Sequence, residues 1–152
     1  MDIKKIDKMD KKILNLLIKN AKTPVVEIAK HCKISAAAIH KRINKLEELG
    51  IIQAYRLQIN PLSIDLKTQA FVGVILERAN MYALVSEQLK NIPEIIELHF
   101  TTGQYGILAK IFCKDNKHLQ EVLVKIHNIT GVSNTDTMIS IEQLIDRNLP
   151  LS

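Results

Sequence analysis

Between residues 23 and 50 the apolar positions recur every three or four residues, in two short runs separated by a tight turn. That spacing predicts two short helices with a common buried side. The positions expected to be buried are Ile28, Ala29, Cys32, Ile39, Ile43 and Leu46. Thr23 is expected to cap the first helix with Pro24 in its first turn, Ser35 to cap the second, and Gly50 to take a left-handed conformation after it.

The opposite face of the second helix is basic and begins with small residues. Alanine permits close approach to a surface, while lysine, arginine and asparagine present hydrogen-bond donors to base edges. This pattern predicts a recognition helix in a DNA major groove, and the alternative is an ordinary amphipathic helix with a solvated basic face. The candidate DNA-binding residues are Ala36, Ala37, His40, Lys41, Arg42, Asn44 and Lys45.

A third helix is expected to precede these two. It begins after Asp7, with Asp10 completing a capping box, and its apolar stripe is Met9, Ile13, Leu16 and Leu17. After Gly50 the β-rich run at residues 51–59 predicts a strand, either as a winged-helix ending or as a link to the next module. The expected domains are a winged helix-turn-helix over residues 1–60 and a second domain over residues 61–152, with Pro61-Leu62-Ser63 as the boundary.

The second part alternates strand and helix patterns. Strands are expected at residues 69–77, 94–101, 105–113 and 132–145. Asn80 is expected to cap a helix that runs to Lys90 and is buried through Met81, Leu84, Val85 and Leu89. Asp115 or Asn116 caps another, with Leu119, Val122, Leu123 and Ile126 on its apolar face. The order βαββαβ predicts a ferredoxin-like sandwich, and the fold class is therefore α+β.

The strands of this second part alternate poorly between apolar and polar residues. The runs FVGVIL and YGILAKIFC stay apolar almost throughout. Helices can cover only one face of such a sheet, so we expect a second copy of the sheet to cover the other, giving a two-fold dimer. The alternative is a sheet whose alternation is merely weak.

Charge separates the two parts of the chain. Residues 1–60 hold 13 Lys and Arg against 6 Asp and Glu, whereas residues 61–152 hold 8 against 10. A basic first part suits a polyanion such as DNA. No apolar run is long enough for a membrane span, the first residues are too polar for a signal peptide, and the distant Cys32 and Cys113 suit a reduced, cytoplasmic protein.

Several of these segments resemble the Lrp/AsnC (feast/famine) family of regulators along nearly the whole chain. The matching residues are IDKMDKKILNLL at 6–17, EIAK at 27–30, IHKRINKLEELGIIQAY at 39–55, FVGVIL at 71–76, FTTGQYGILAKI at 100–111 and NTDTMIS at 134–140. The resemblance implies a winged helix-turn-helix joined to a ligand-binding domain, dimers that assemble into octamers or related rings, and an amino-acid effector, with asparagine as first candidate.

Two positions depart from the family pattern. The helix-turn-helix turn usually carries glycine where this chain has Lys33, and a left-handed lysine costs about 1 kcal/mol, so the turn is expected to differ locally. Relatives often carry a polar residue at the position of Gly106, which leaves the identity of the effector open.

The effector site is expected at one hairpin turn and the final strand. The turn offers hydroxyls and backbone N–H groups to a carboxylate, and Asp136 offers a counter-charge to an ammonium group. The resemblance implies that these segments line a cleft between dimers; the alternative is a plain turn beside β-forming threonines. The candidate effector-binding residues are Thr101, Thr102, Gly103, Gln104, Tyr105, Gly106, Asn134, Thr135, Asp136 and Thr137.

An enzyme is not expected. The chain has no glycine-rich phosphate loop, and its five histidines show no metal-ligand spacing, so neither a cofactor nor a metal is predicted. His99 is interpreted as a histidine on a strand surface. Two other functions fit the sequence: an architectural DNA-binding protein that ignores metabolites, and an amino-acid sensor that acts through protein partners.

Overall fold

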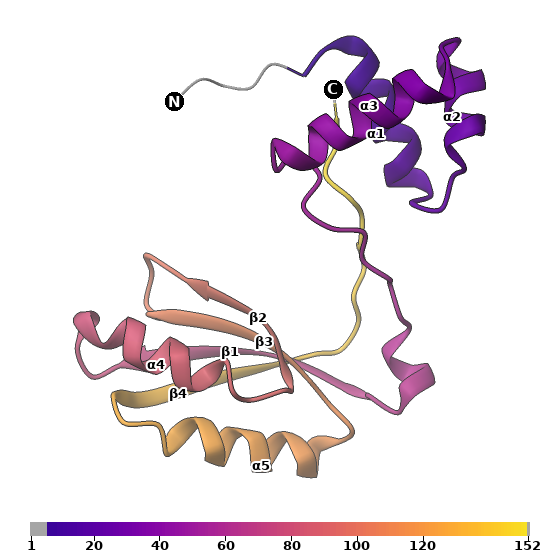
Figure 1. Ribbon diagram of the computed structural model, residues 1–152. Helices are drawn as coiled ribbons and strands as arrows, with labels where there is room; N and C mark the ends of the chain where they lie inside the picture. The colour runs from indigo at the N-terminus through magenta and orange to yellow at the C-terminus, as the bar shows by residue number, and fades with distance from the viewer. Residues whose placement is uncertain (1–5, 152) are drawn as a thin grey trace. The chain divides into compact units, whose positions relative to one another are not determined.

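The computed structural model describes residues 6–151 and divides the chain into two compact units (Figure 1). One unit extends to Gln58 and also takes in the C-terminal residues from Ile145, and the other is Ile59–Leu144. The C-terminal residues join the first unit through a hydrogen bond from Gln58 to Asp146 (2.7 Å) and one from Asn148 to the carbonyl of Ile18 (3.3 Å). The domain limits 1–60 and 61–152 stay a prediction.

The first unit is a three-helix cluster made of α1 (Lys8–Lys19), α2 (Val25–Cys32) and α3 (Ala36–Glu48). All three expected helices are confirmed. Their shared core buries most of the residues that the helical period selected, because each helix turns one apolar stripe inward. These residues are Ile13, Ile28, Ala29, Cys32, Ile39 and Ile43. Of the stripe predicted for α1 only Ile13 is fully buried, whereas Met9, Leu16 and Leu17 are partly buried against the core.

Two of the three predicted helix caps are confirmed in this unit. The Asp7 side chain accepts from the N–H of Asp10 at 2.7 Å, and the Asp10 side chain accepts from the N–H of Asp7 at 3.1 Å. Ser35 Oγ accepts from the N–H of Ala38 at 3.2 Å. The cap assigned to Thr23 is wrong, because its hydroxyl donates to the carbonyl of Asn20 at 2.7 Å and so belongs to the preceding turn.

The turn between α2 and α3 keeps its left-handed residue although that residue is a lysine. Lys33 has φ 57° and ψ 39°, so the expectation of a locally different turn is wrong. The conformation is supported by the N–H of Ile34, which reaches back to the carbonyl of Ala29 at 3.2 Å. Gly50 has φ +68° after α3, as predicted.

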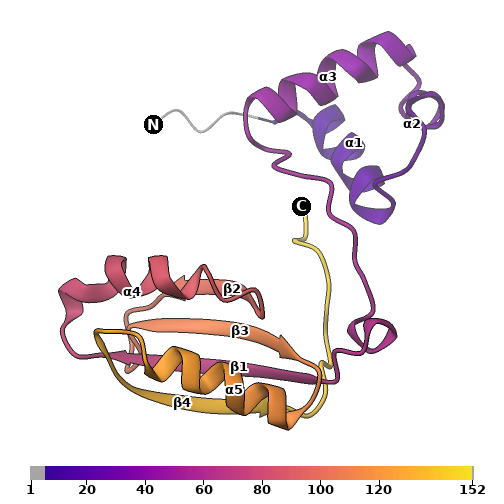
Figure 2. The same cartoon turned by 60° about the horizontal axis from the view of Figure 1, so that its bottom comes forward.

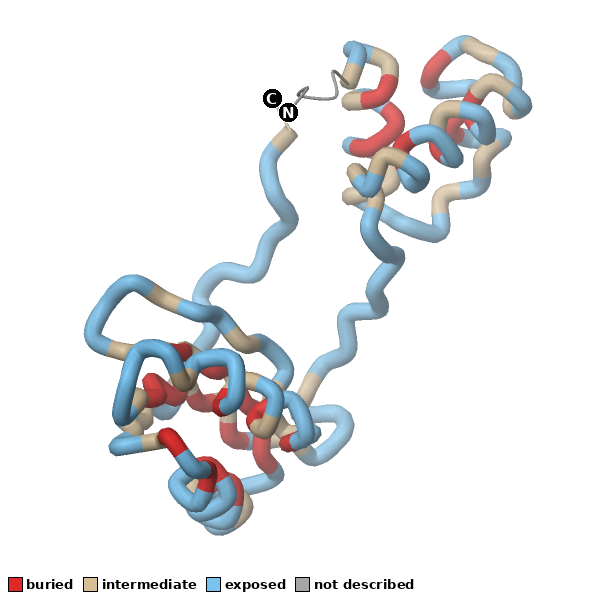
Figure 3. The backbone as a smooth tube through the Cα atoms, turned by 60° about the vertical axis from the view of Figure 1, so that its left-hand side comes forward, coloured by how far each residue is buried: buried red, intermediate tan, exposed pale blue. Residues whose placement is uncertain are grey.

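The strand predicted at residues 51–59 is wrong: no strand is assigned there in the described structure. A β-strand needs a neighbouring strand to receive its backbone hydrogen bonds, and no described strand pairs with this run. The segment is an extended, exposed linker (Figure 3), in which Tyr55, Leu57 and Ile59 are each at least half exposed.

The second unit contains β1 (Thr68–Leu76), α4 (Tyr82–Leu89), β2 (Ile95–Phe100), β3 (Ile107–Cys113), α5 (Asn116–His127) and β4 (Val132–Ser140). Short 3-10 turns, Pro61–Ile64 and Ala79–Met81, precede β1 and α4. The four strands form one antiparallel sheet in the order β2-β3-β1-β4 (Figure 2). This is the predicted βαββαβ sandwich, and β4 stops at Ser140 because its partner β1 has no paired residue beyond Gln69.

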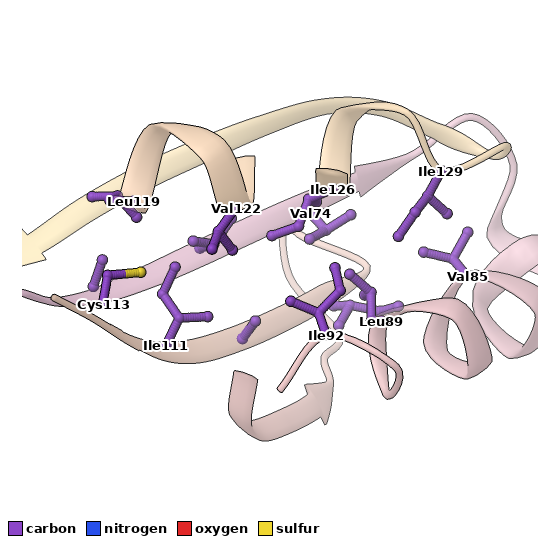
Figure 4. Packing of buried hydrophobic residues seen from close by; sticks show 14 residues of the cluster. Val74, Val85, Leu89, Ile92, Ile111, Cys113, Leu119, Val122, Ile126 and Ile129 are labelled. Atoms are coloured by element: carbon purple, nitrogen blue, oxygen red, sulfur yellow. The ribbon is translucent and has the colours of Figure 1, made fainter. Parts of the chain in front are cut away.

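Both helices pack on the same face of the sheet. Figure 4 shows Val122 and Ile126 of α5 pointing toward strand residues such as Val74 and Ile111. On α4, Val85 and Leu89 are fully buried, whereas Leu84 is 51% exposed, contrary to prediction. The eight-residue helix α4 buries only a narrow stripe, and the 3-10 turn in front of it displaces Asn80 from the predicted capping position. Asp115 caps α5 as predicted.

Burial along the central strands alternates even though their sequence does not. Alternate residues of β3 are buried under the helices, and those between them are half-buried on the other face. We call this second face the open face; its apolar members are Phe71, Ile75, Leu108, Phe112 and Met138.

A largely buried carboxylate, that of Glu94, lies beside α5 in the second unit. Burial of Glu94 disfavours its charged form, but hydrogen bonds from its own backbone and from His118, with the charge of Lys125, hold its pKa below the usual value. His118 Nε2 is 3.0 Å from Glu94 Oε1. The nearby Cys113 thiol is fully buried, and burial raises its pKa to about 11.

Candidate functional site

Helix α3 presents a polar face to solvent opposite its buried stripe. His40, Lys41, Asn44 and Lys45 are exposed along this face. Ala37 is exposed near its N-terminal end, and Ala36 is partly buried. The helix therefore begins with small alanine side chains and continues with amide and ammonium donors, a combination that suits a helix entering the major groove of DNA.

Arg42 differs from the other α3 candidates because its guanidinium is already occupied. It lies 2.7 Å from Asp7 Oδ2 and 2.7 Å from Asp10 Oδ1, at the N-terminus of α1. The pKa of Arg42 is raised by its hydrogen bonds to Asp7 and then Asp10. The Asp7 pKa is lowered, chiefly by its backbone hydrogen bond from Asp10 and then by Arg42. Arg42 thus joins α3 to α1, a role that the sequence pattern did not predict.

A second set of candidates surrounds the turn between β2 and β3. The N–H of Thr101 donates to the carbonyl of Gly106 at 3.2 Å, and the N–H of Gly106 donates to the carbonyl of Val74 at 3.0 Å. The Thr101 hydroxyl donates to the carbonyl of Tyr105. Thr102, Gly103 and Gln104 are exposed, and no hydrogen bond within residues 6–151 occupies their backbone N–H groups. The base of the turn is fixed while its tip keeps free donors.

Tyr105 extends from this turn to the final strand. Its hydroxyl donates to Asp136 Oδ2 at 2.5 Å, which raises the pKa of Tyr105. The ring lies over Gly73, the β1 residue paired with Asp136. A Cβ at Gly73 would lie only 2.5 Å from two ring carbons of Tyr105, so glycine is required here for the ring to lie against the sheet.

Gly106 has a comparable steric role beside the same turn. A Cβ built on Gly106 would lie 2.7 Å from Leu76 Cδ1. A side chain at Gly106 would therefore collide with Leu76, so glycine lets the turn pack closely against the end of β1.

The candidates on β4 divide between the two faces of the sheet. Asp136 and Asn134 pair with Gly73 and Ile75 and lie on the open face. Thr135 and Thr137 pair with Val74 and Val72, whose side chains are buried beneath the helices. Thr135 Oγ1 is 2.7 Å from His127 Nε2. The structure thus brings Tyr105 and Asp136 together and places the two threonines on the other face.

These contacts show what the sequence analysis missed. From the sequence alone, Gly73 looked like one more residue of an apolar strand, because its role depends on the register that places it under Tyr105.

His99 lies on the open face, 3.5 Å from Glu97 and largely exposed, as a strand-surface histidine. Within residues 6–151, no group of three or more His, Cys, Asp and Glu side chains could hold a metal ion. No helix in this same range is both long and apolar enough to cross a membrane.

Two protein-family models match successive parts of the chain. Residues 6–53 match the winged helix-turn-helix DNA-binding model, and residues 69–150 match the Lrp/AsnC ligand binding domain. Regulatory protein AsnC of Escherichia coli is 34% identical over 145 residues, which cover 95% of each chain. An HTH-type transcriptional regulator of Pyrococcus furiosus is 37% identical over 134 residues, 88% of each chain.

Solved structures show the same similarity. The structure of Escherichia coli AsnC matches with a TM-score of 0.91 and 34% identity, covering 95% of this chain and 98% of that one. A transcriptional regulator of Neisseria meningitidis in complex with L-Met matches with a TM-score of 0.90 and 26% identity, covering 96% and 97%.

Proposed function

Because this chain belongs to the Lrp/AsnC family of transcriptional regulators, we propose that it binds specific DNA sites through α3 under the control of an amino-acid effector. The observation that supports this proposal is that one chain contains two separate candidate sites. One is the exposed basic face of α3; the other is a turn with free N–H donors beside the carboxylate of Asp136.

The effector chemistry follows from the second site. The exposed tip at Thr102–Gln104 offers donors for a carboxylate, and Asp136 on the open face offers a counter-charge for an ammonium group. A free amino acid carries both groups. Asparagine is the first candidate by resemblance to AsnC, and methionine is the second because the Neisseria regulator was solved with L-Met.

We propose a dimer as the functional unit, in which the open faces of two sheets pack together over Phe71, Leu108 and Phe112. Asp136 on the edge strand β4 and the turn at residues 101–106 would then stay at the rim of this interface, within reach of a neighbouring dimer. Two copies of α3 would then address two half-sites about one helical turn of DNA apart. Further assembly of dimers into an octamer, with the effector between dimers, would couple ligand binding to the spacing of these helices. Such coupling requires the ligand to bind one assembly more tightly than another.

Lys41→Ala and Asn44→Ala are expected to impair sequence-specific binding, each by about 1–3 kcal/mol, because each removes a donor suited to base edges. Binding to selected operator DNA and to a scrambled duplex is measured by electrophoretic mobility shift over a range of salt. Glu87→Ala, on α4 and outside the recognition face, is the control. Equal binding of parent and variants to operator DNA would exclude this face. Steep salt dependence without site preference would instead favour an architectural DNA-binding protein.

Asp136→Ala is expected to weaken amino-acid binding about ten-fold, since it removes the counter-charge for the ammonium group. Ligand-free DNA binding should be unchanged, because Asp136 lies in the other unit from α3. Calorimetry with the twenty amino acids at millimolar concentration measures the affinity, and light scattering measures assembly. If the parent binds none of them, the amino-acid sensor assignment fails while the DNA-binding assignment stands. If the parent binds DNA under no condition, a sensor acting through protein partners is favoured.

A further inference from the structure

The carboxylate expected to receive the effector's ammonium group is already hydrogen-bonded to Tyr105. We propose that the Tyr105 side chain is a displaceable plug on the effector site, which an amino acid must move from Asp136 before it binds. This inference rests on the proposed function and adds to it a residue that sets the affinity and the ligand class. Tyr105 would act as a gate, through competition for Asp136.

The Tyr105 ring packs closely against the sheet at Gly73. Gly73 lacks a side chain at the point where the ring rests, and a Cβ there would lie 2.5 Å from Cδ1, 2.5 Å from Cγ and 2.7 Å from Cδ2 of Tyr105. Contact with three ring atoms means that the ring covers Gly73 closely. Glycine inside a strand weakens it and commonly marks a place where another group approaches the backbone. Here that group is the phenol ring.

The backbone beneath the plug is held independently of the ring. The Thr101 hydroxyl donates to the carbonyl of Tyr105, and the N–H of Gly106 donates to the carbonyl of Val74. Neither bond involves the phenol. The ring can therefore leave Gly73 by side-chain rotation, without the slower motion of a whole loop, while the donors of the turn stay in place.

The competition selects for a charged ligand. A phenol is a neutral donor to Asp136 Oδ2, whereas an α-ammonium group adds full charge attraction to the same carboxylate. A ligand without that charge gains too little to displace the ring. The apparent affinity is reduced by the fraction of time the plug is closed, so removing the plug raises it. The site should accept free α-amino acids and reject their N-acetyl derivatives.

Two variants open the plug by different routes. Tyr105→Phe removes the donor, and Gly73→Ala displaces the ring while leaving the phenol intact. Both are expected to bind asparagine, or the best amino acid of the screen, about ten-fold more tightly than the parent in calorimetry. Tyr55→Phe is the matched control, because its phenol also donates to a carboxylate, Glu47 Oε1 at 2.9 Å, in the other unit. Its affinity should equal that of the parent.

A spectroscopic readout separates a gate from a structural contact. The chain has three tyrosines and no tryptophan, so its near-ultraviolet absorbance reports on few groups. At pH 7 the effector carries its ammonium group, and a difference spectrum with and without effector should show a change in phenol absorbance when Tyr105 is released from Asp136. The same difference spectrum of Tyr105→Phe should show no such change.

The outcomes distinguish the plug from the sensor. Tighter binding by both variants, or binding by the variants where the parent binds nothing, supports the plug. If the parent binds an amino acid and Tyr105→Phe binds it equally or less well, the plug is excluded and the sensor stands. If parent and variants all fail to bind any amino acid, the sensor and the plug fail together. Should Gly73→Ala not fold, Tyr105→Phe alone decides.

Discussion

Phe71→Glu is expected to prevent formation of the proposed dimer, with association weakened at least about a hundred-fold because a charge would be buried between two sheets. Phe71 is half-buried on the open face, in the central strand β1, between Lys110 of β3 and Met138 of β4. The single chain tolerates glutamate there, since Lys110 lies beside it. The assembled dimer would have to desolvate that carboxylate.

Sedimentation velocity of the full-length chain, over a range of concentrations, measures this effect. Val124→Glu is the matched control, because Val124 is 53% exposed on the outer side of α5. The control should sediment as the parent does. A Phe71→Glu variant that keeps the parent's size would show that the open face is not the interface, and a monomeric parent would remove the dimer from the proposal. Loss of the dimer should also weaken operator binding, since the two half-sites would be bound separately.

Arg42→Met is expected to destabilise the first unit by about 3 kcal/mol, because it leaves the Asp10 carboxylate in the protein interior without its charged partner. The Asp10 side chain is only 6% exposed, whereas that of Arg42 is 35% exposed. The cost therefore comes mainly from Asp10 and less from the lost arginine. Methionine keeps the unbranched aliphatic stem of arginine, so that packing along α3 changes little.

Urea unfolding followed by far-ultraviolet circular dichroism measures this loss. Lys45→Met is the matched control, an exposed cation on the same helix, and it should change stability by less than about 0.5 kcal/mol. Adding Asp10→Asn to Arg42→Met should recover part of the loss, since a neutral amide replaces the unpaired carboxylate. Equal stability of parent and Arg42→Met would mean that the ion pair contributes nothing and that Arg42 is free to contact DNA.

The sequence predicted those features that depend on residues close together in the chain. The capping box of Asp7 and Asp10 and the Ser35 cap need only neighbours three residues away, and both were predicted correctly. The buried stripes of the helices follow from the helical period alone. The order of strands and helices likewise specified the ferredoxin-like sandwich, because few topologies suit βαββαβ.

Features that depend on distant partners were missed. The residues at 51–59 have strand propensity, but a strand forms only where a neighbour supplies its hydrogen bonds. Gly73 and Asp136 are 63 positions apart and become neighbours only through the register of β1 and β4. The same holds for Arg42, whose basic side chain fits a DNA-binding face as well as it fits an ion pair with α1. The charge of arginine is compatible with either a DNA contact or an ion pair, and only the packing of the helices decides which of the two forms.

The buried Cys113 has a practical consequence for attaching chemical probes to this regulator. With a thiol pKa of about 11, only about one molecule in 10⁴ carries the reactive thiolate at pH 7. Cys32, the other cysteine of the chain, is also buried. A cysteine introduced at an exposed position should therefore react with maleimide far faster than either native thiol. Fluorophores or spin labels can be placed singly on the linker at residues 51–59, on α3 or on the turn between β2 and β3 without first removing the native cysteines.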